Sequence, residues 1–130
     1  MENRDQVLIK YRTDSLGNTL KESSFEEYFQ NKTLRPILKF QNELLIDLFI
    51  NYAIKQKKVY FSLDENKKLL YIEHSIQRDL KFRNLLFGVV IGFFTKDELL
   101  EYSNNNQAIN KRMAALIIER LKSQNQLLKS

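Results

Sequence analysis

Apolar residues recur at intervals of three and four positions along most of the chain, a spacing typical of amphipathic α-helices. The pattern predicts a short helix within residues 5–16 and an aromatic-faced helix opened by the pair Ser23 and Ser24. A long helix of about six turns is expected from Leu34 to the basic loop at residues 55–58. Further helices are expected over about residues 64–80, 80–94, 96–102 and 107–122.

Polar residues at helix starts and stops set the expected boundaries. Thr33 is a predicted N-cap, with Pro36 in the first turn where it loses no needed hydrogen bond. Ser62 with Glu65, and Thr95 with Glu98, follow the capping-box spacing. Residues 59–61 are expected to form a short extended link, and the Asn-rich tract 103–106 to end a helix, because such side chains compete for backbone hydrogen bonds.

The longest uninterrupted apolar run is Leu85–Phe94, and we expect it to form the central helix of the protein. Its ten residues are half of the roughly 20 that cross a bilayer, so we expect no membrane span. Gly88 and Gly92 lie one turn apart in this run, where each costs about 1 kcal/mol relative to alanine. Close helix packing at both glycines is the preferred explanation, and a groove that admits a partner helix or ligand is the alternative.

Composition supports one helical domain. The 130 residues are enough for one core, and three Gly with one Pro disfavour a many-stranded β fold. The sequence therefore predicts an all-α, compact single-domain bundle of about five to seven helices around the central apolar helix at about 80–94. Residues 1–22 are expected to dock weakly and residues 123–130 to fray. No Cys and no signal-peptide pattern are present, so a cytoplasmic location is expected.

The net charge of +5 is uneven along the chain. Residues 1–31 hold four Lys or Arg against six Asp or Glu, whereas residues 32–130 hold seventeen against ten. A sequence pI near 9.4 that arises from the body of the protein is compatible with a polyanionic partner such as RNA.

The sequence contains few of the residue patterns that catalytic sites require. His74 is the only histidine, so a site that needs two imidazoles is excluded within one chain, and a structural role is expected for it. Acids such as Glu43 with Asp47, and Asp97 with Glu98 and Glu101, are spaced as solvated helix faces. The Gly-x-Ser-x-Gly elbow and the Gly-rich phosphate loop are absent. We therefore expect a protein that is not an enzyme and has no cofactor or metal.

Three basic clusters are the candidates for polyanion binding, either as one converged patch or as separate solvated faces. Their phosphate contacts would add to a salt-dependent affinity. Phe40 and Phe82 lie near them and are candidates for base stacking or for the core. The candidate residues are Lys32, Arg35, Lys39, Arg78, Lys81, Arg83, Lys111 and Arg112. Arg120 and Lys122 are expected to be solvated and paired.

Four ordered motifs carry a resemblance: residues 29–39 (FQNKTLRPILK), Arg78-Asp79-x-Lys81-x-Arg83-Asn84, Gly88-x-x-x-Gly92-x-Phe94-Thr95 and residues 110–113 (NKRM). Over about residues 24–122 the chain resembles a family of short, all-helical flavobacterial (Bacteroidota) proteins that carry the name glyoxalase. The resemblance implies a lyase that acts on the hemithioacetal of methylglyoxal and glutathione. Glyoxalases use metal ligands in βαβββ modules or a His-x-His-x-Asp-His cluster, and neither pattern occurs in this sequence.

The leading functional hypothesis is a non-catalytic binding protein for RNA, within a ribonucleoprotein such as the ribosome. The alternative is a protein–protein interaction module that uses the aromatic face of residues 25–29 or the glycine groove. A glyoxalase-type activity is the third and disfavoured reading.

Overall fold

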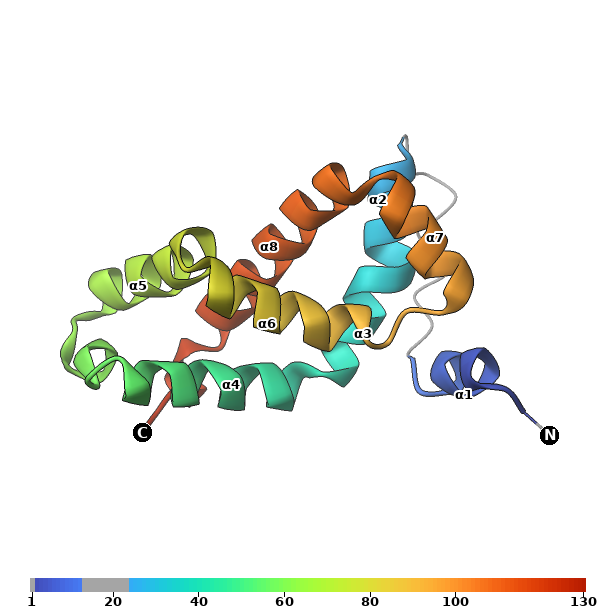
Figure 1. The fold of residues 1–130 in the computed structure, drawn as a ribbon. Helices are drawn as coiled ribbons and strands as arrows, with labels where there is room; N and C mark the ends of the chain where they lie inside the picture. Colours follow the sequence, from blue (N-terminus) through green and yellow to red (C-terminus); the bar gives the residue numbers. More distant parts are fainter. Residues whose placement is uncertain (1, 13–23) are drawn as a thin grey trace.

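The computed structural model describes residues 2–12 and 24–130, and the described part is all-α (Figure 1). The long helices are α4 (Asn42–Lys55), α5 (Glu65–Arg78), α6 (Leu80–Ile91) and α8 (Asn106–Ser123). The short helices are α1 (Arg4–Lys10), α2 (Phe25–Phe29), α3 (Arg35–Phe40) and α7 (Lys96–Asn104). A π-helical turn η2 (Gln30–Leu34) and 3₁₀ turns η3 (Val59–Ser62) and η4 (Asn125–Leu127) complete the list. No strand occurs in these ranges and the buried apolar side chains form one cluster, which confirms the all-α bundle.

Helix α8 is the central element of the bundle. It crosses the molecule diagonally in Figure 1 and contacts α2, η2, α5, α6 and α7. Its buried side chains are Ile109, Met113, Leu116, Ile117, Ile118 and Leu121. The apolar helix α6 buries one face only, and Leu85 on its other face is 51% exposed. Helix α6 packs its buried face against α4, α5 and α8, so it shares the centre of the bundle with α8 while its other face meets solvent. None of the described helices is long and apolar enough to cross a bilayer.

The predicted six-turn helix is wrong, because the chain bends at Gln41. The N–H of Gln41 donates to the carbonyl of Ile37 at 2.8 Å and closes α3, while its own carbonyl accepts from the N–H of Leu45 at 3.0 Å and opens α4. The amide side chain of Gln41 donates to the carbonyl of Val89 in α6 at 3.3 Å. Residues 41–43 are polar and interrupt the apolar series between Leu38 and Leu45, a sign of the bend that the prediction of one long helix did not use.

Residues 25–40 form a nearly continuous helical rod with a π-helical turn in its middle. The hydroxyl of Ser24 accepts from the N–H of Glu27 at 3.1 Å, which confirms the predicted start. Thr33 is not an N-cap, since it lies inside η2 and is 2% exposed. Its hydroxyl donates to the Glu98 carboxylate at 2.9 Å, so tertiary contact and not capping explains this threonine.

The link between α4 and α5 also differs from the prediction. Residues 59–61 belong to a 3₁₀ turn and not to an extended segment, because Lys57 and Lys58 turn the chain with φ of 65° and 59°. The N-cap of α5 is Asp64 in place of Ser62, and its carboxylate accepts from the N–H of Lys67 at 2.9 Å. An aspartate two residues further on is as good a cap as serine.

The remaining boundaries follow local capping rules. The carboxylate of Asp79 caps α6 by accepting from the N–H of Phe82, so the chain bends between α5 and α6. Thr95 and Glu98 form the predicted capping box of α7. The Asn-rich tract ends α7 at Asn104, as predicted, and α6 ends at Ile91, three residues before the predicted end.

Close helix packing at the two glycines is a wrong prediction. Gly88 is exposed, and a Cβ built on it would meet no described atom within 4 Å outside its own helical turns. Gly92 is the exposed C-cap of α6, where a Cβ would lie 3.1 Å from the carbonyl oxygen of Gly88. Helix termination and not a helix crossing explains Gly92, and nothing in the structure explains Gly88.

A buried carboxylate joins the amino-terminal segment to the bundle. Glu98 is 7% exposed, which corrects the prediction that it lies on a solvated face. Its two oxygens accept from the guanidinium of Arg12 at 2.6 Å each. The hydroxyl of Thr33 and the N–H of Thr95 (2.8 Å) also donate to it. Burial alone would raise the pKa of Glu98, but the hydrogen bonds from Arg12, Thr95 and Thr33 hold this pKa below its ordinary value.

Both ends of the chain contact the bundle. Helix α1 buries no residue, yet Arg4 donates at 2.9 Å to the carbonyls of both Gly92 and Phe94, just beyond the end of α6. Predicted weak docking at 13–22 lies outside the described residues. At the other end Leu128 is 2% exposed, so the segment predicted to fray has one buried side chain, while Lys129 and Ser130 beyond it are exposed. An apolar side chain of this size holds the chain end by burial.

Substitution of the two glycines by alanine should have different effects on the stability of the fold. Gly88→Ala should raise the free energy of unfolding by about 0.5–1 kcal/mol, because the helix gains alanine propensity in open space. Gly92→Ala should give no gain or a loss, because its Cβ would press on the Gly88 carbonyl. Urea unfolding followed by circular dichroism measures both. A clear loss of stability in Gly88→Ala would contradict this description of α6.

Removal of the buried charge should destabilise the fold. Glu98→Gln should lower the free energy of unfolding by about 3–5 kcal/mol, because it leaves the Arg12 guanidinium buried without a counter-charge. Asp97→Asn is the matched control, since Asp97 is exposed in the same helical turn and should change stability by less than about 1 kcal/mol. Equal losses in the two variants, by urea unfolding, would rule out a special role for Glu98.

The same carboxylate predicts a pH dependence of stability. The pKa of Glu98 is lower in the folded state, so its contribution is present above the ordinary value near 4.5 and is lost as pH falls through the folded pKa. Wild-type stability should therefore fall more steeply than that of Glu98→Gln as the pH drops below about 4.5. Urea unfolding of both proteins at a series of pH values checks this, and parallel curves would contradict it.

Candidate functional site

Three concave sites lie along α8. The first lies between α3 and α8 and has a volume of about 210 Å³. The second, of about 480 Å³, lies between α8, α6 and the end of α5, and the third, of about 590 Å³, between α5 and α8. We call their combined lining the α8 surface; its charged side chains are Arg35, Arg83, Lys111, Arg120, Lys122, Glu73 and Glu119.

Cations dominate the α8 surface. Five cationic side chains and two carboxylates line this surface. One cation is neutralised, because Lys122 donates to Glu73 at 2.9 Å. No carboxylate of the described residues lies within 4.0 Å of the other four, which are Arg35, Arg83, Lys111 and Arg120. Lys111 and Arg120 are separated by about 14 Å along α8 and, being nine residues apart, lie on opposite sides of this helix. The four cations therefore form two pairs, Arg83 with Lys111 and Arg35 with Arg120.

Arg83 and Lys111 come from two of the sequence clusters, and the structure places them in one pocket. The guanidinium carbon of Arg83 lies 5.9 Å from the centre of the Phe87 ring, within the range of a cation–π contact. The Nε of Arg83 is buried, and no described residue accepts a hydrogen bond from it. Lys111 is exposed at the rim. The pocket therefore holds one cation in contact with an aromatic ring and one that is exposed at the rim.

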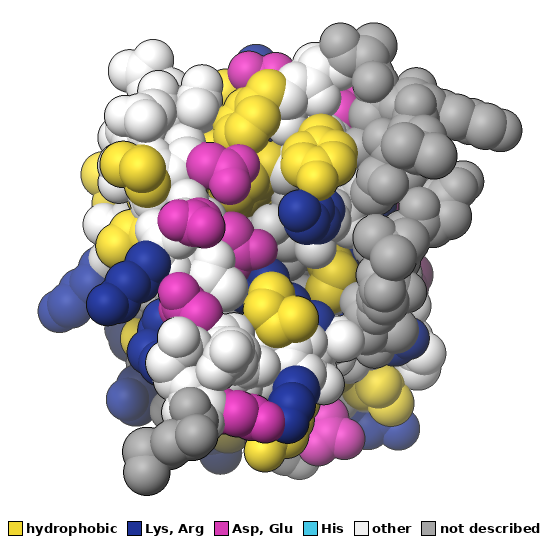
Figure 2. Space-filling view, turned by 90° about the vertical axis from the view of Figure 1, so that its right-hand side faces the viewer, with side chains coloured by type: hydrophobic (Ala, Val, Ile, Leu, Met, Phe, Trp, Pro, Cys, Tyr) yellow, Lys and Arg dark blue, Asp and Glu magenta, His cyan; other side chains and the backbone are white. Residues whose placement is uncertain are grey.

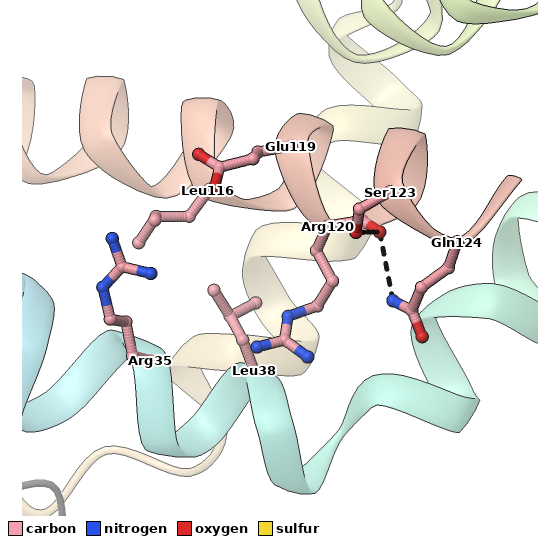
Figure 3. Close-up of a pocket in the computed structure, with 7 residues that line it drawn as sticks. All are labelled: Arg35, Leu38, Leu116, Glu119, Arg120, Ser123 and Gln124. Carbon is pink, nitrogen blue, oxygen red and sulfur yellow. Dashed lines mark hydrogen bonds between the residues drawn. The ribbon is translucent and has the colours of Figure 1, made fainter.

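Arg35 and Arg120 form a second pair across the α3–α8 pocket. Figure 3 shows the two side chains extending toward the gap from opposite helices, with Leu38 between them. The Nε of Arg35 donates to the side-chain oxygen of Asn31 at 2.9 Å. Burial and the nearby charge of Arg35 lower the pKa of Arg120, while Glu119 opposes this effect. Arg120 was predicted to be solvated and paired, and it is neither fully exposed nor ion-paired with a described residue.

An amide network positions Arg120. Its guanidinium donates to the side-chain oxygen of Asn42 at 3.3 Å, a weak contact. Asn42 in turn exchanges hydrogen bonds with the side chain of Gln124 at 2.7 Å and 2.8 Å. Gln124 also donates to the carbonyl of Arg120 at 3.0 Å, as drawn in Figure 3. The first turn of α4 thus fixes the carboxyl end of α8 and the arginine near it.

Lys32 lies apart from the α8 surface, although it is three residues from Arg35. Its ammonium lies 5.2 Å from the centre of the Tyr28 ring. The Tyr28 hydroxyl and, more weakly, the charge of Glu101 raise the pKa of Lys32. Figure 2 shows the face that carries α7 and α1, where Asp and Glu side chains are interspersed with apolar ones. Lys32 therefore faces acids, and the predicted grouping of Lys32 with Arg35 is not formed.

The other candidates are dispersed. Arg112 is half-buried and donates to the side-chain oxygen of Gln30 at 3.1 Å, which ties α8 to η2. Lys39 and Lys81 are exposed. Phe82 is 5% exposed and stacks on Tyr52, which places it in the core. Phe40 is 46% exposed.

Arg78 lines a separate groove of about 660 Å³, together with Tyr52, Tyr71, His74 and Asp79. The hydroxyl of Tyr52 donates to the Asp79 carboxylate at 3.0 Å. Burial and this bond raise the pKa of Tyr52 well above its ordinary value. The phenol is therefore held protonated as a structural donor that ties α4 to the start of α6.

Metal ligands are not gathered in the described structure. No group of three or more His, Asp or Glu side chains lies close enough to hold a metal ion in the described ranges. The residues present do not fit the metal that the glyoxalase resemblance implies, and no catalytic step through a metal follows from them.

Fold and site define the protein as a small helical protein with a cationic surface along its central helix. Comparisons of the chain with protein-family models, with curated proteins and with solved structures found no match. The resemblance to the glyoxalase-named family therefore stays a prediction.

Proposed function

We propose that this protein is a non-catalytic RNA-binding protein that uses the α8 surface on the phosphate backbone, within a ribonucleoprotein such as the ribosome. The observation that carries the proposal is the set of four cations without an ion pair among the described residues: Arg35, Arg83, Lys111 and Arg120. Most other described cations also lack an ion pair, so the argument rests on the gathering of these four in the pockets beside α8, because a surface where cations outnumber carboxylates attracts polyanions.

The same arrangement favours backbone contact over base recognition. Of the two aromatic candidates, Phe82 is buried, and the exposed Phe40 lines none of the pockets of the α8 surface, so neither offers a face there for a base to stack on. Arginine and lysine contacts to phosphates fix the register of a nucleic acid and carry little sequence information. We therefore expect affinity that varies strongly with salt and weakly with RNA sequence.

The salt dependence gives a quantitative test. Each phosphate contact contributes about −0.7 to the slope of log K against log salt for single-stranded RNA. Arg35→Gln and Lys111→Gln should each make the slope shallower by about 0.7, and the double variant by about 1.4. Both side chains are exposed, so the fold should survive both changes. Fluorescence anisotropy with a labelled single-stranded RNA at several salt concentrations measures these slopes.

Two control variants remove one positive charge each, as Arg35→Gln and Lys111→Gln do. Lys55→Gln lies at the exposed end of α4, and Lys32→Gln lies among acids, so both should leave the slope close to that of the wild type. Wild-type protein that shows no salt-sensitive binding to total RNA, and from which no RNA co-purifies, would overturn the proposal.

A protein–protein interaction module is the second candidate. It is favoured by the exposed side of α6, where Leu85 is 51% exposed beside the open backbone of Gly88. A small residue next to an exposed apolar one lets a partner helix approach closely. Co-purification of a stoichiometric protein that survives nuclease treatment, and that Leu85→Lys abolishes, would favour this function over RNA binding.

A further inference from the structure

We infer that the pocket between Arg35 and Arg120 is a binding site for one phosphate group. Its lining also includes Leu38, Leu116 and Glu119. If the phosphate group belongs to RNA, the inference rests on the proposed function. Free phosphate would occupy the pocket whether or not the protein binds RNA.

The first argument is the arrangement of hydrogen-bond donors. The Nε of Arg35 donates to the side-chain oxygen of Asn31, and no described residue accepts from the Nη1 or Nη2 of Arg35. The Nη1 of Arg120 donates one long hydrogen bond, of 3.3 Å, to Asn42. No described residue accepts from the Nη2 or the Nε of Arg120. The anchored guanidiniums therefore keep several N–H groups for a ligand.

The second argument is the charge balance in a partly desolvated place. Two like charges approach each other here, and Glu119 is the single carboxylate in the lining. Leu38 and Leu116 lie beneath the pocket and are 1% and 7% exposed, so a ligand would meet mainly polar groups. An anion between the guanidiniums would relieve their repulsion.

The third argument is the size and shape of the pocket. Drug-sized ligands occupy mostly apolar pockets of about 300–1,000 Å³. This pocket is smaller, at about 210 Å³, and its rim carries two arginines. A carboxylate has two oxygens in one plane and is satisfied by one arginine fork, whereas a tetrahedral phosphate presents oxygens to two forks from opposite sides. The geometry therefore favours phosphate over carboxylate.

The side-chain Nε–Hε signals of arginine in ¹H–¹⁵N spectra test the inference directly. Inorganic phosphate, titrated at constant ionic strength against chloride, should shift the Arg35 and Arg120 signals along one saturable curve. The signal of Arg78 is the internal control, because this exposed arginine lies in another groove, and it should shift little. Absence of a saturable shift at Arg35 and Arg120, or an equal shift at Arg78, would overturn the inference.

Variants that keep the charge distinguish a specific phosphate site from general attraction of anions by the positive surface. Arg120→Lys keeps the charge and loses the planar fork, so phosphate affinity should fall about tenfold, and affinity unchanged in this variant would overturn the inference. The change replaces one weak hydrogen bond to Asn42, so circular dichroism should report an intact fold. Lys111→Arg, outside the pocket, should leave phosphate affinity unchanged, and an altered affinity would count against a local site.

An RNA arm separates this inference from the proposed function. If phosphate saturates the pocket and also displaces a short RNA, both are supported. If RNA binds with the salt slopes given above and phosphate leaves the pocket signals unshifted, the pocket assignment fails and the RNA-binding proposal stands. If phosphate binds and RNA does not, the pocket stands and the RNA-binding proposal fails.

Discussion

The fold depends on one desolvated carboxylate. Glu98 accepts from Arg12, from Thr33 and from the N–H of Thr95, and these groups come from three separate segments of the chain. A buried carboxylate without such donors would be strongly unfavourable, so the segments are held together by the need to satisfy it. Arg12 also donates to the carbonyl of Phe93, beyond the end of α6. Docking of the amino-terminal segment and the orientation of α7 are therefore linked through one side chain.

The sequence predicted the fold wherever a boundary depends on neighbouring residues alone. Ser24 and the Thr95–Glu98 capping box lie where their spacing places them. Predictions failed where a distant contact decides the structure. Spacing identified Glu98 as a capping residue, but its burial depends on Arg12, which lies 86 positions away in the chain. The bend at Gln41 was missed although the polar residues 41–43 interrupt the apolar series, because a polar stretch of this length also fits the solvated side of a straight helix.

The candidate site was predicted in part for the same reason. Sequence clustering grouped Lys32 with Arg35, but the π-helical turn directs Lys32 toward Tyr28 and the acids of α7. Arg83 and Lys111 lie 28 positions apart and meet only because α6 packs on α8. Arg120 was assigned to the solvated surface. The signal that would have found it is helical spacing, because Arg112, Leu116 and Arg120 recur every four residues and so share one side of α8.

The bend and the cationic pocket are parts of one structural feature. Because the chain turns at Gln41, α3 and α4 leave the corner in different directions (Figure 1). The first residue of α4 contacts the residue that follows α8 through hydrogen bonds. That residue, Asn42, accepts from Arg120 and pairs with Gln124, while α3 carries Arg35 to the opposite side of the gap. A straight helix over residues 34–55 would carry Asn42 away from α8 and leave Arg120 without its anchor. The like charges are therefore brought together by the packing of the corner, and an anion is the group that would stabilise this arrangement further.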